Sequence, residues 1–222
     1  MAVPTLSESP PSVTDGVFFS DPGPLPRGRH GLTREQVQAG QRERLLIAVT
    51  ELLAAHGYRG FGPGEIASRA GVSLAAFYDC FENKEACVFA GYDRFIEVLL
   101  TRMAALDETG KDRRTLANEI VDIYLGTLGS DLVVARAYQV EIDALGPPAR
   151  ERRRNALNAF AAYFRELSDR ASPDGRLLPW TAFVGVVYAA RQLASDALDA
   201  ETEPDLAALG EDLQIWISDL FR

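Results

Sequence analysis

The chain has 222 residues, 47% of them hydrophobic and 25% charged, which is ordinary for a soluble globular protein. Two cysteines and two histidines are too few for a disulfide scaffold and a poor supply for a zinc site or histidine-based catalysis. No apolar run is long enough to span a membrane, and no secretory signal pattern opens the chain, so we expect a cytoplasmic protein.

The net charge of −9 argues at first against nucleic acid as a partner. The charge is unevenly distributed, however. Residues 27–102 hold ten basic and nine acidic side chains, and the acidic excess lies in the remainder. A slightly basic portion joined to an acidic body is compatible with a DNA reader that carries a separate regulatory domain.

Residues 1–32 are rich in Pro, Ser, Gly and Asp and show little periodicity, which predicts a disordered N-terminal arm. Arg27 and Arg29 lie near its end, either in a solvated linker or in an arm that contacts DNA.

Helical signals dominate the rest of the chain. Thr33 and Gln36 form a capping box for a helix that ends near His56, and Asn83 caps a long helix. The expected helices span residues 33–56, 63–70, 73–81, 84–106, 111–128, 131–145, 147–171, 179–199 and 203–221. Because no strand alternation of useful length appears, we predict an all-α fold of about nine helices, with a three-helix unit at 33–82 and a helical body at 83–222.

The segment from Glu65 to Phe77 reads EIASRAGVSLAAF and has the pattern of a helix-turn-helix, two short helices joined by a glycine-containing turn. Gly71 tolerates a positive φ in the turn, and Ser73 caps the second helix. Ile66 and Phe77 would fill the wedge between the helices. A buried helical hairpin would give the same local pattern.

Residues 44–92 resemble the N-terminal domain of the TetR family of transcriptional regulators. The resemblance is carried by RLLIAVTELLAAHGY, by EIASRAGVS and by FYDCFENKEACVFAGYD, in family order and spacing. It implies a homodimeric DNA-binding repressor that a small-molecule effector releases from a palindromic double-stranded operator. It implies no cofactor, no metal and no enzymatic activity, and no phosphate-binding loop or catalytic triad motif is present.

The resemblance also implies roles for individual residues. Ser73 would cap the recognition helix and Asp79 would accept from a cytosine, pair with Arg59 or stay a plain surface charge. The remaining implied DNA contacts are Leu74, Ala75 and Ala76 on base edges, Tyr78 and Lys84 on phosphates, and Arg27 and Arg29 in the minor groove.

Two departures from the family pattern favour an alternative. Phe61 and Gly62 stand where relatives carry a hydroxyl that caps the helix and bonds a phosphate, with Pro63 in place of an aliphatic residue, and Leu74 stands where a basic residue is common. The alternative is a helical ligand-binding protein whose DNA binding is weakened or lost.

The C-terminal body (83–222) would sense a ligand and dimerise. Its expected pocket residues, each of which would otherwise be plain core, are Phe95, Leu99, Tyr124, Arg136, Tyr138, Glu141, Phe160 and Phe164. The run Arg150–Arg154 is interpreted as a solvated helix face. The expected dimer interface, which could instead be intramolecular core, holds Trp180, Phe183, Val184, Val187, Tyr188, Leu209, Leu213, Trp216 and Leu220.

Overall fold

The computed structural model describes residues 11–21, 23, 31–171, 178–200 and 202–221. Within these residues the chain forms nine α-helices and one 3₁₀ helix, with no strand. The helices are α1 (Arg34–His56), α2 (Pro63–Ala70), α3 (Leu74–Cys80), α4 (Lys84–Ala104), α5 (Arg113–Gly129), α6 (Leu132–Gln139), η1 (Glu141–Leu145), α7 (Pro147–Ala171), α8 (Trp180–Asp199) and α9 (Leu206–Leu220). The all-α prediction is confirmed. No described helix is long and apolar enough to cross a membrane.

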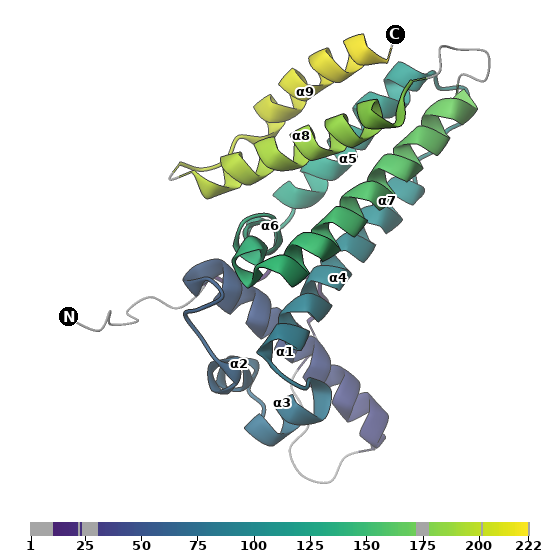
Figure 1. Cartoon of the computed structure of the whole chain (residues 1–222). Helices are drawn as coiled ribbons and strands as arrows, with labels where there is room; N and C mark the ends of the chain where they lie inside the picture. Colours follow the sequence, from purple (N-terminus) through teal and green to yellow (C-terminus); the bar gives the residue numbers. More distant parts are fainter. Residues whose placement is uncertain (1–10, 22, 24–30, 172–177, 201, 222) are drawn as a thin grey trace, which may run out of the picture.

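Helices α1, α2 and α3 pack on one another at one end of the molecule (Figure 1). The predicted cap of α1 is present, with Thr33 accepting from the Gln36 N–H and the Gln36 side chain accepting from the Thr33 N–H. Gly62 caps α2 through its backbone alone, because its N–H donates to the Glu65 carboxylate at 2.9 Å. Local sequence therefore fixes where these helices begin.

The turn between α2 and α3 follows the expected chemistry. Gly71 has a φ of +66°, in the left-handed region that favours glycine. Ser73 Oγ accepts from the Ala76 N–H at 3.1 Å and starts α3. Ile66 and Phe77 are completely buried against α1, so the wedge is filled as predicted.

Helix α4 runs from this end into a body formed by α5 to α9 (Figure 1). Within the body α5 packs on α9, and α7 packs on α8. α1 also contacts α4 and α6, so the two parts of the chain share a continuous core.

The expected helix over 131–145 is wrong in part. α6 ends at Gln139, and a 3₁₀ turn, η1, continues to Leu145. Gly146, with a φ of +77°, then reverses the chain into α7. The break frees the Gln139 carbonyl, which accepts from Arg191 and Ser195 of α8.

The predicted disordered arm is wrong for residues 11–21. Phe18 and Phe19 are buried in the core, and Phe18 stacks on Phe95 of α4 with ring centroids 5.5 Å apart. The Val13 N–H donates to Glu51 of α1, and the Thr14 N–H donates to Asp131 before α6. Two aromatic side chains supply enough apolar surface to order a segment whose overall composition resembles a linker.

Candidate functional site

Helix α3 leaves Leu74, Ala75, Tyr78 and Asp79 exposed to solvent, four of the residues that are expected to contact DNA. Tyr78 is 54% exposed, and its ring packs edge-on against Phe77 at 5.3 Å. The outer face thus combines a small apolar patch with one phenol and one carboxylate. No lysine or arginine lies on α3.

Ala76 does not share that face. It is only 7% exposed and lies beside Phe77 on the inner side of α3. Ser73 starts the helix, and the packing of α3 on α1 and α2 leaves position 76 on the buried side. The prediction that Ala76 contacts base edges is therefore wrong.

Lys84 is anchored inside the protein. Its Nζ donates to the carbonyl oxygens of Tyr58 and Phe61 at 2.7 and 2.8 Å and lies over both aromatic rings, 4.0 and 5.0 Å from their centroids. Partial burial lowers the pKa of Lys84, and Glu65 opposes the shift. Two of its three N–H donors thus hold the loop between α1 and α2 and are not available to a phosphate, which corrects the expected role.

Asp79 is exposed and forms no ion pair with Arg59 or any other described residue. Its backbone carbonyl accepts from the Gln38 side chain of α1 at 3.1 Å, which ties the end of α3 to the first helix. Arg27 and Arg29 lie outside the described residues.

A cavity of about 780 Å³, including its opening to solvent, lies within the C-terminal body between α4, α5, α6, α7, α8 and α9. Its walls are predominantly apolar, and the predicted residues that line it are Phe95, Leu99, Tyr124, Tyr138, Phe160 and Phe164.

Arg136 and Glu141 do not line the cavity. Arg136 donates to the Leu198 carbonyl at 2.8 Å and pairs with Asp199 at 3.2 Å and with Glu141 at 3.7 Å. Burial raises the pKa of Glu141, and Arg136 counteracts it. The two charges were expected to orient a ligand, but they satisfy each other and join α6 to the end of α8.

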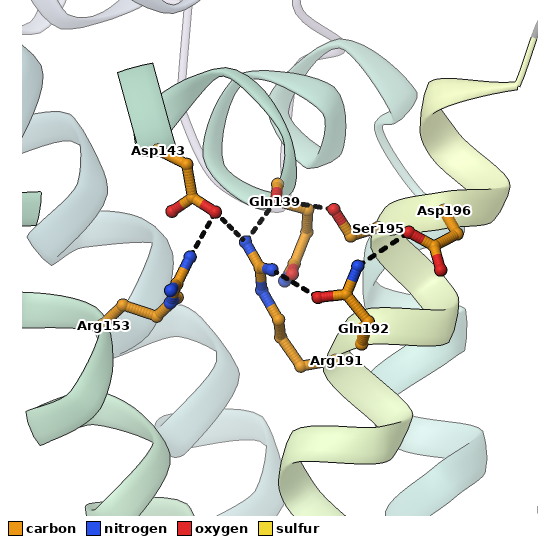
Figure 2. A network of polar contacts seen from close by, with 7 residues as sticks. All are labelled: Gln139, Asp143, Arg153, Arg191, Gln192, Ser195 and Asp196. Atoms are coloured by element: carbon orange, nitrogen blue, oxygen red, sulfur yellow. Dashed lines mark hydrogen bonds and ion pairs between the residues drawn. The ribbon is translucent and has the colours of Figure 1, made fainter. Parts of the chain in front are cut away.

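The polar residues at the cavity are Arg153, Arg191 and Gln139, which sequence reasoning missed. Figure 2 shows both guanidinium groups turned toward Asp143. Arg191 is only 8% exposed; it donates to the Gln139 carbonyl at 2.5 Å and to Asp143 at 3.3 Å, and Arg153 also donates to Asp143.

A signal for these residues exists in the sequence. Arg153 precedes Leu157 and Phe160 by four and seven residues, so it shares their inward stripe of α7 and departs from the expected solvated face of 150–154. Arg191 continues the inward stripe of Val187 in the same way.

Two tyrosine hydroxyls lie near this charged cluster. Burial raises the pKa of Tyr92 to about 12, and Arg191 and Arg153 counteract part of the shift. Burial also raises the pKa of Tyr124, again opposed by the charge of Arg191. Both remain neutral at physiological pH and can donate a hydrogen bond.

The cavity is coupled to the helix-turn-helix end by direct contacts. Tyr138 of α6 lines the cavity, and its hydroxyl forms a 2.7 Å hydrogen bond with Thr50 of α1. Phe95 lines the cavity and stacks on Phe18 of the N-terminal segment.

Large apolar side chains remain exposed on α8 and α9, which pack on each other (Figure 1). Phe183 and Leu213 are buried within the chain, so their expected place in a dimer interface is wrong. Of the other expected residues, Val184, Val187, Leu209 and Leu220 are half-buried. Trp180, Tyr188 and Trp216 are exposed, together with Leu193 and Ile215, which sequence reasoning missed.

Comparison with known proteins matches the helix-turn-helix end by sequence and most of the chain by fold. The family model of bacterial regulatory proteins, tetR family, matches residues 45–90. The HTH-type transcriptional activator FasR of Mycolicibacterium smegmatis is 31% identical over 91 residues, 41% of this chain and 42% of the relative. The HTH-type nicotine-responsive transcriptional repressor HdnoR of Paenarthrobacter nicotinovorans is 26% identical over 91 residues, 41% of this chain and 47% of the relative. The match thus spans less than half the length of either curated relative.

Solved structures share the fold over most of the chain. The fatty acid degradation regulator FadR from Bacillus halodurans has a TM-score of 0.70 at 19% identity, covering 80% of this chain and 94% of its own. FadR from Bacillus subtilis in complex with stearoyl-CoA has a TM-score of 0.65 at 17% identity, covering 79% and 96%. The chain thus carries a helix-turn-helix segment that matches the model of the tetR family of bacterial regulatory proteins, on an all-α body that shares its fold with solved bacterial regulators.

Proposed function

We propose that the protein is a homodimeric repressor that binds a palindromic operator and leaves it when a small molecule enters the cavity of the C-terminal body. The observation that carries the DNA-binding part is the outward face of α3, where Leu74, Ala75 and Tyr78 project from the domain that the family model matches. Two such helices, one from each protomer, would enter successive major grooves.

The chemistry of this face favours a particular mode of reading. Leu74 and Ala75 are apolar and small enough to contact thymine methyl groups, whereas α3 offers no arginine for a bidentate contact with guanine. The Tyr78 hydroxyl would reach a phosphate. Specificity would therefore depend on methyl contacts and on the spacing of the two half-sites.

The exposed apolar side chains of α8 and α9 support dimerisation. Ile215 is 68% exposed and Trp216 is 45% exposed, and neighbouring exposed apolar groups of this size mark interaction surfaces. A partner's α8 and α9 would cover them in a four-helix bundle.

The contacts between cavity and DNA-binding end support release by an effector. Tyr138 and Phe95 both contribute to the cavity wall. Tyr138 bonds Thr50 of α1, and Phe95 stacks on Phe18 in a segment whose Val13 N–H donates to Glu51 of α1. A ligand that displaces either side chain would move α1 relative to α4 and change the separation of the two recognition helices. DNA binding would weaken, because the half-sites of the operator fit one separation only.

The relatives do not decide the effector or the direction of regulation. One curated relative is named an activator and the other a nicotine-responsive repressor, and one solved structure contains stearoyl-CoA. Repression and a place of action in the cytoplasm, where the operator is, are therefore part of the proposal.

Fluorescence anisotropy with DNA from upstream of the protein's own gene tests the proposal, at about 50 mM and about 200 mM salt because phosphate contacts weaken with salt. We expect binding that weakens with salt, and a Leu74→Gln variant that changes sequence preference. Absence of binding at the lower salt concentration, with folding confirmed by circular dichroism, would contradict it.

The absence of any basic residue on α3 favours one second candidate, a ligand-binding protein that has lost DNA binding. The same titration distinguishes the two: a ligand-binding protein of this kind would bind no DNA at either salt concentration yet retain its cavity.

A further inference from the structure

The cavity is chemically asymmetric. Most of its wall consists of apolar side chains from α4, α5, α7 and α8, among them Leu99, Val121, Phe160 and Val186. The two charged groups that line it, Arg153 and Arg191, meet at one place, where both contact Asp143. One part of the cavity is thus strongly polar and the rest is not.

The charges at this polar end do not balance. Two guanidinium groups, one from α7 and one from α8, face a single carboxylate, Asp143 of η1 (Figure 2). Asp93 also acts on the nearby Tyr92, but it is exposed and accepts two hydrogen bonds from Arg152, at 2.8 and 2.9 Å. A net positive charge therefore remains at the wall of an apolar cavity, where an anion would neutralise it.

Hydrogen-bond donors are also in excess there. A guanidinium carries five N–H donors, and the contacts of Arg153 at this site use only its Nη1 group toward Asp143. The hydroxyls of Tyr92 and Tyr124 lie close enough to Arg191 for its charge to affect their titration. The Tyr124 hydroxyl is buried, and its main polar neighbour is the Gln139 side chain.

From this arrangement we infer that the cavity binds an amphipathic monocarboxylate, with its apolar part between Leu99 and Phe160 and its carboxylate against Arg153 and Arg191. A carboxylate matches the planar fork of a guanidinium and accepts from phenols, and one negative charge neutralises the excess. The inference rests on the proposed ligand-responsive function and adds to it the chemical class of the ligand.

A purely structural role explains less of the arrangement. Arg191 does tie α8 to the end of α6 through the Gln139 carbonyl, but Ser195 already donates to the same oxygen at 2.9 Å. Arg153 of α7 and Arg191 of α8 each hold Asp143 of η1, and Arg191 also donates to Gln192 Oε1 at 3.3 Å, but these contacts leave two cations with one anion. An anionic ligand accounts for the second cation.

Isothermal titration calorimetry on the full chain without DNA tests the inference with two acid and alcohol pairs: dodecanoate with 1-dodecanol, and 4-phenylbutanoate with 4-phenyl-1-butanol. We expect at least one acid to bind at least about tenfold more tightly than its alcohol, as a charge-assisted hydrogen bond provides. Acetate, which has the charge but no apolar part, should not bind measurably.

Variants locate the site. Arg153→Met should weaken the acid about tenfold and leave the alcohol unchanged, whereas Arg153→Lys should fall between Arg153→Met and the unmodified protein. Arg152→Met is the matched control, because Arg152 is the neighbouring arginine of α7 and pairs with Asp93 outside the cavity. Ala190→Leu, which fills the apolar part, should weaken acid and alcohol alike. Circular dichroism melts confirm that each variant is folded.

The inference is overturned if neither acid binds, if each alcohol binds as tightly as its acid, or if Arg153→Met and Arg152→Met have the same effect on the acid. Because no DNA is present, these results are independent of the repressor proposal. Acid binding by a protein that ignores DNA would refute repression alone, and DNA binding by a protein that ignores both acids would refute the ligand class alone.

Discussion

The hydroxyl of Tyr138 on α6 forms a 2.7 Å hydrogen bond with the hydroxyl of Thr50 on α1, and both side chains are fully buried. Tyr138 also lines the cavity, so one side chain contacts both the ligand site and the first helix of the DNA-binding end. Thr50 donates in addition to the Leu46 carbonyl at 2.7 Å, which leaves Tyr138 as the donor to Thr50.

Tyr138→Phe should lower the free energy of unfolding by about 1 kcal/mol, the usual net contribution of a hydrogen bond. It should also reduce the change in operator affinity that an effector causes, because the ring remains and only the contact with α1 is lost. Urea unfolding and anisotropy with and without effector measure the two effects. Tyr163→Phe is the control, since Tyr163 lines the cavity but donates to Met103 of α4. An equal loss of response in both variants would contradict the coupling.

Gly91→Ala should destabilise the protein by about 1–3 kcal/mol, the cost of overpacking a core. A Cβ at this position would overlap the Tyr138 hydroxyl and lie 2.9 Å from its Cζ, and the hydrogen bond to Thr50 prevents that ring from moving away. Gly126→Ala, on the exposed side of α5 with no atom near the added methyl, should be neutral or stabilising. Thermal melts compare them, and a normal melt for Gly91→Ala would refute the close packing.

Lys84→Met should lower the stability of the DNA-binding end. The slope of log operator affinity against log salt concentration should change by less than the loss of one phosphate contact would cause. The reason is that Lys84 donates to the carbonyls of Tyr58 and Phe61. Tyr78→Phe, by contrast, should weaken binding without affecting the melt, because Tyr78 is exposed. A large fall in the salt slope for Lys84→Met would restore the phosphate role expected from the sequence.

Ile215→Glu should convert a dimer to monomers. Its side chain is exposed in the single chain, so the change should cost nothing in the monomer and leave helicity intact, while a buried charge opposes dimerisation. Light scattering after size exclusion gives the mass, and Asn155→Glu, at an exposed position of α7, is the control. If Ile215→Glu remains dimeric, α8 and α9 do not form the interface.

The features that could be predicted are those decided by local chemistry. Gly71 and Ser73 fix the turn through conformations and caps that each residue type favours, and the inward stripe of Phe160 and Phe164 follows from helical spacing. Ser73 also starts α3, but the packing that turns Ala76 inward involves two other helices and could not be read from this segment alone.

The features that could not be predicted depend on contacts between distant parts of the chain. Lys84 is held by carbonyls more than twenty residues away, and Arg191 by the carbonyl that the end of α6 at Gln139 exposes. Composition gave no sign of the buried position of Phe18, because a single aromatic partner on α4 decides it.

The backbone amides of Val13 and Thr14 offer an internal reporter of the cavity. Their N–H groups donate to Glu51 and Asp131, and the segment that carries them is held by Phe18 on Phe95, a ring that also forms part of the cavity wall. If a ligand in the cavity shifts Phe95, the segment loosens, and these two amides should exchange with deuterium faster. Glu51 also accepts from Arg69 of α2 at 2.7 Å, so the same carboxylate that protects Val13 contacts the helix-turn-helix.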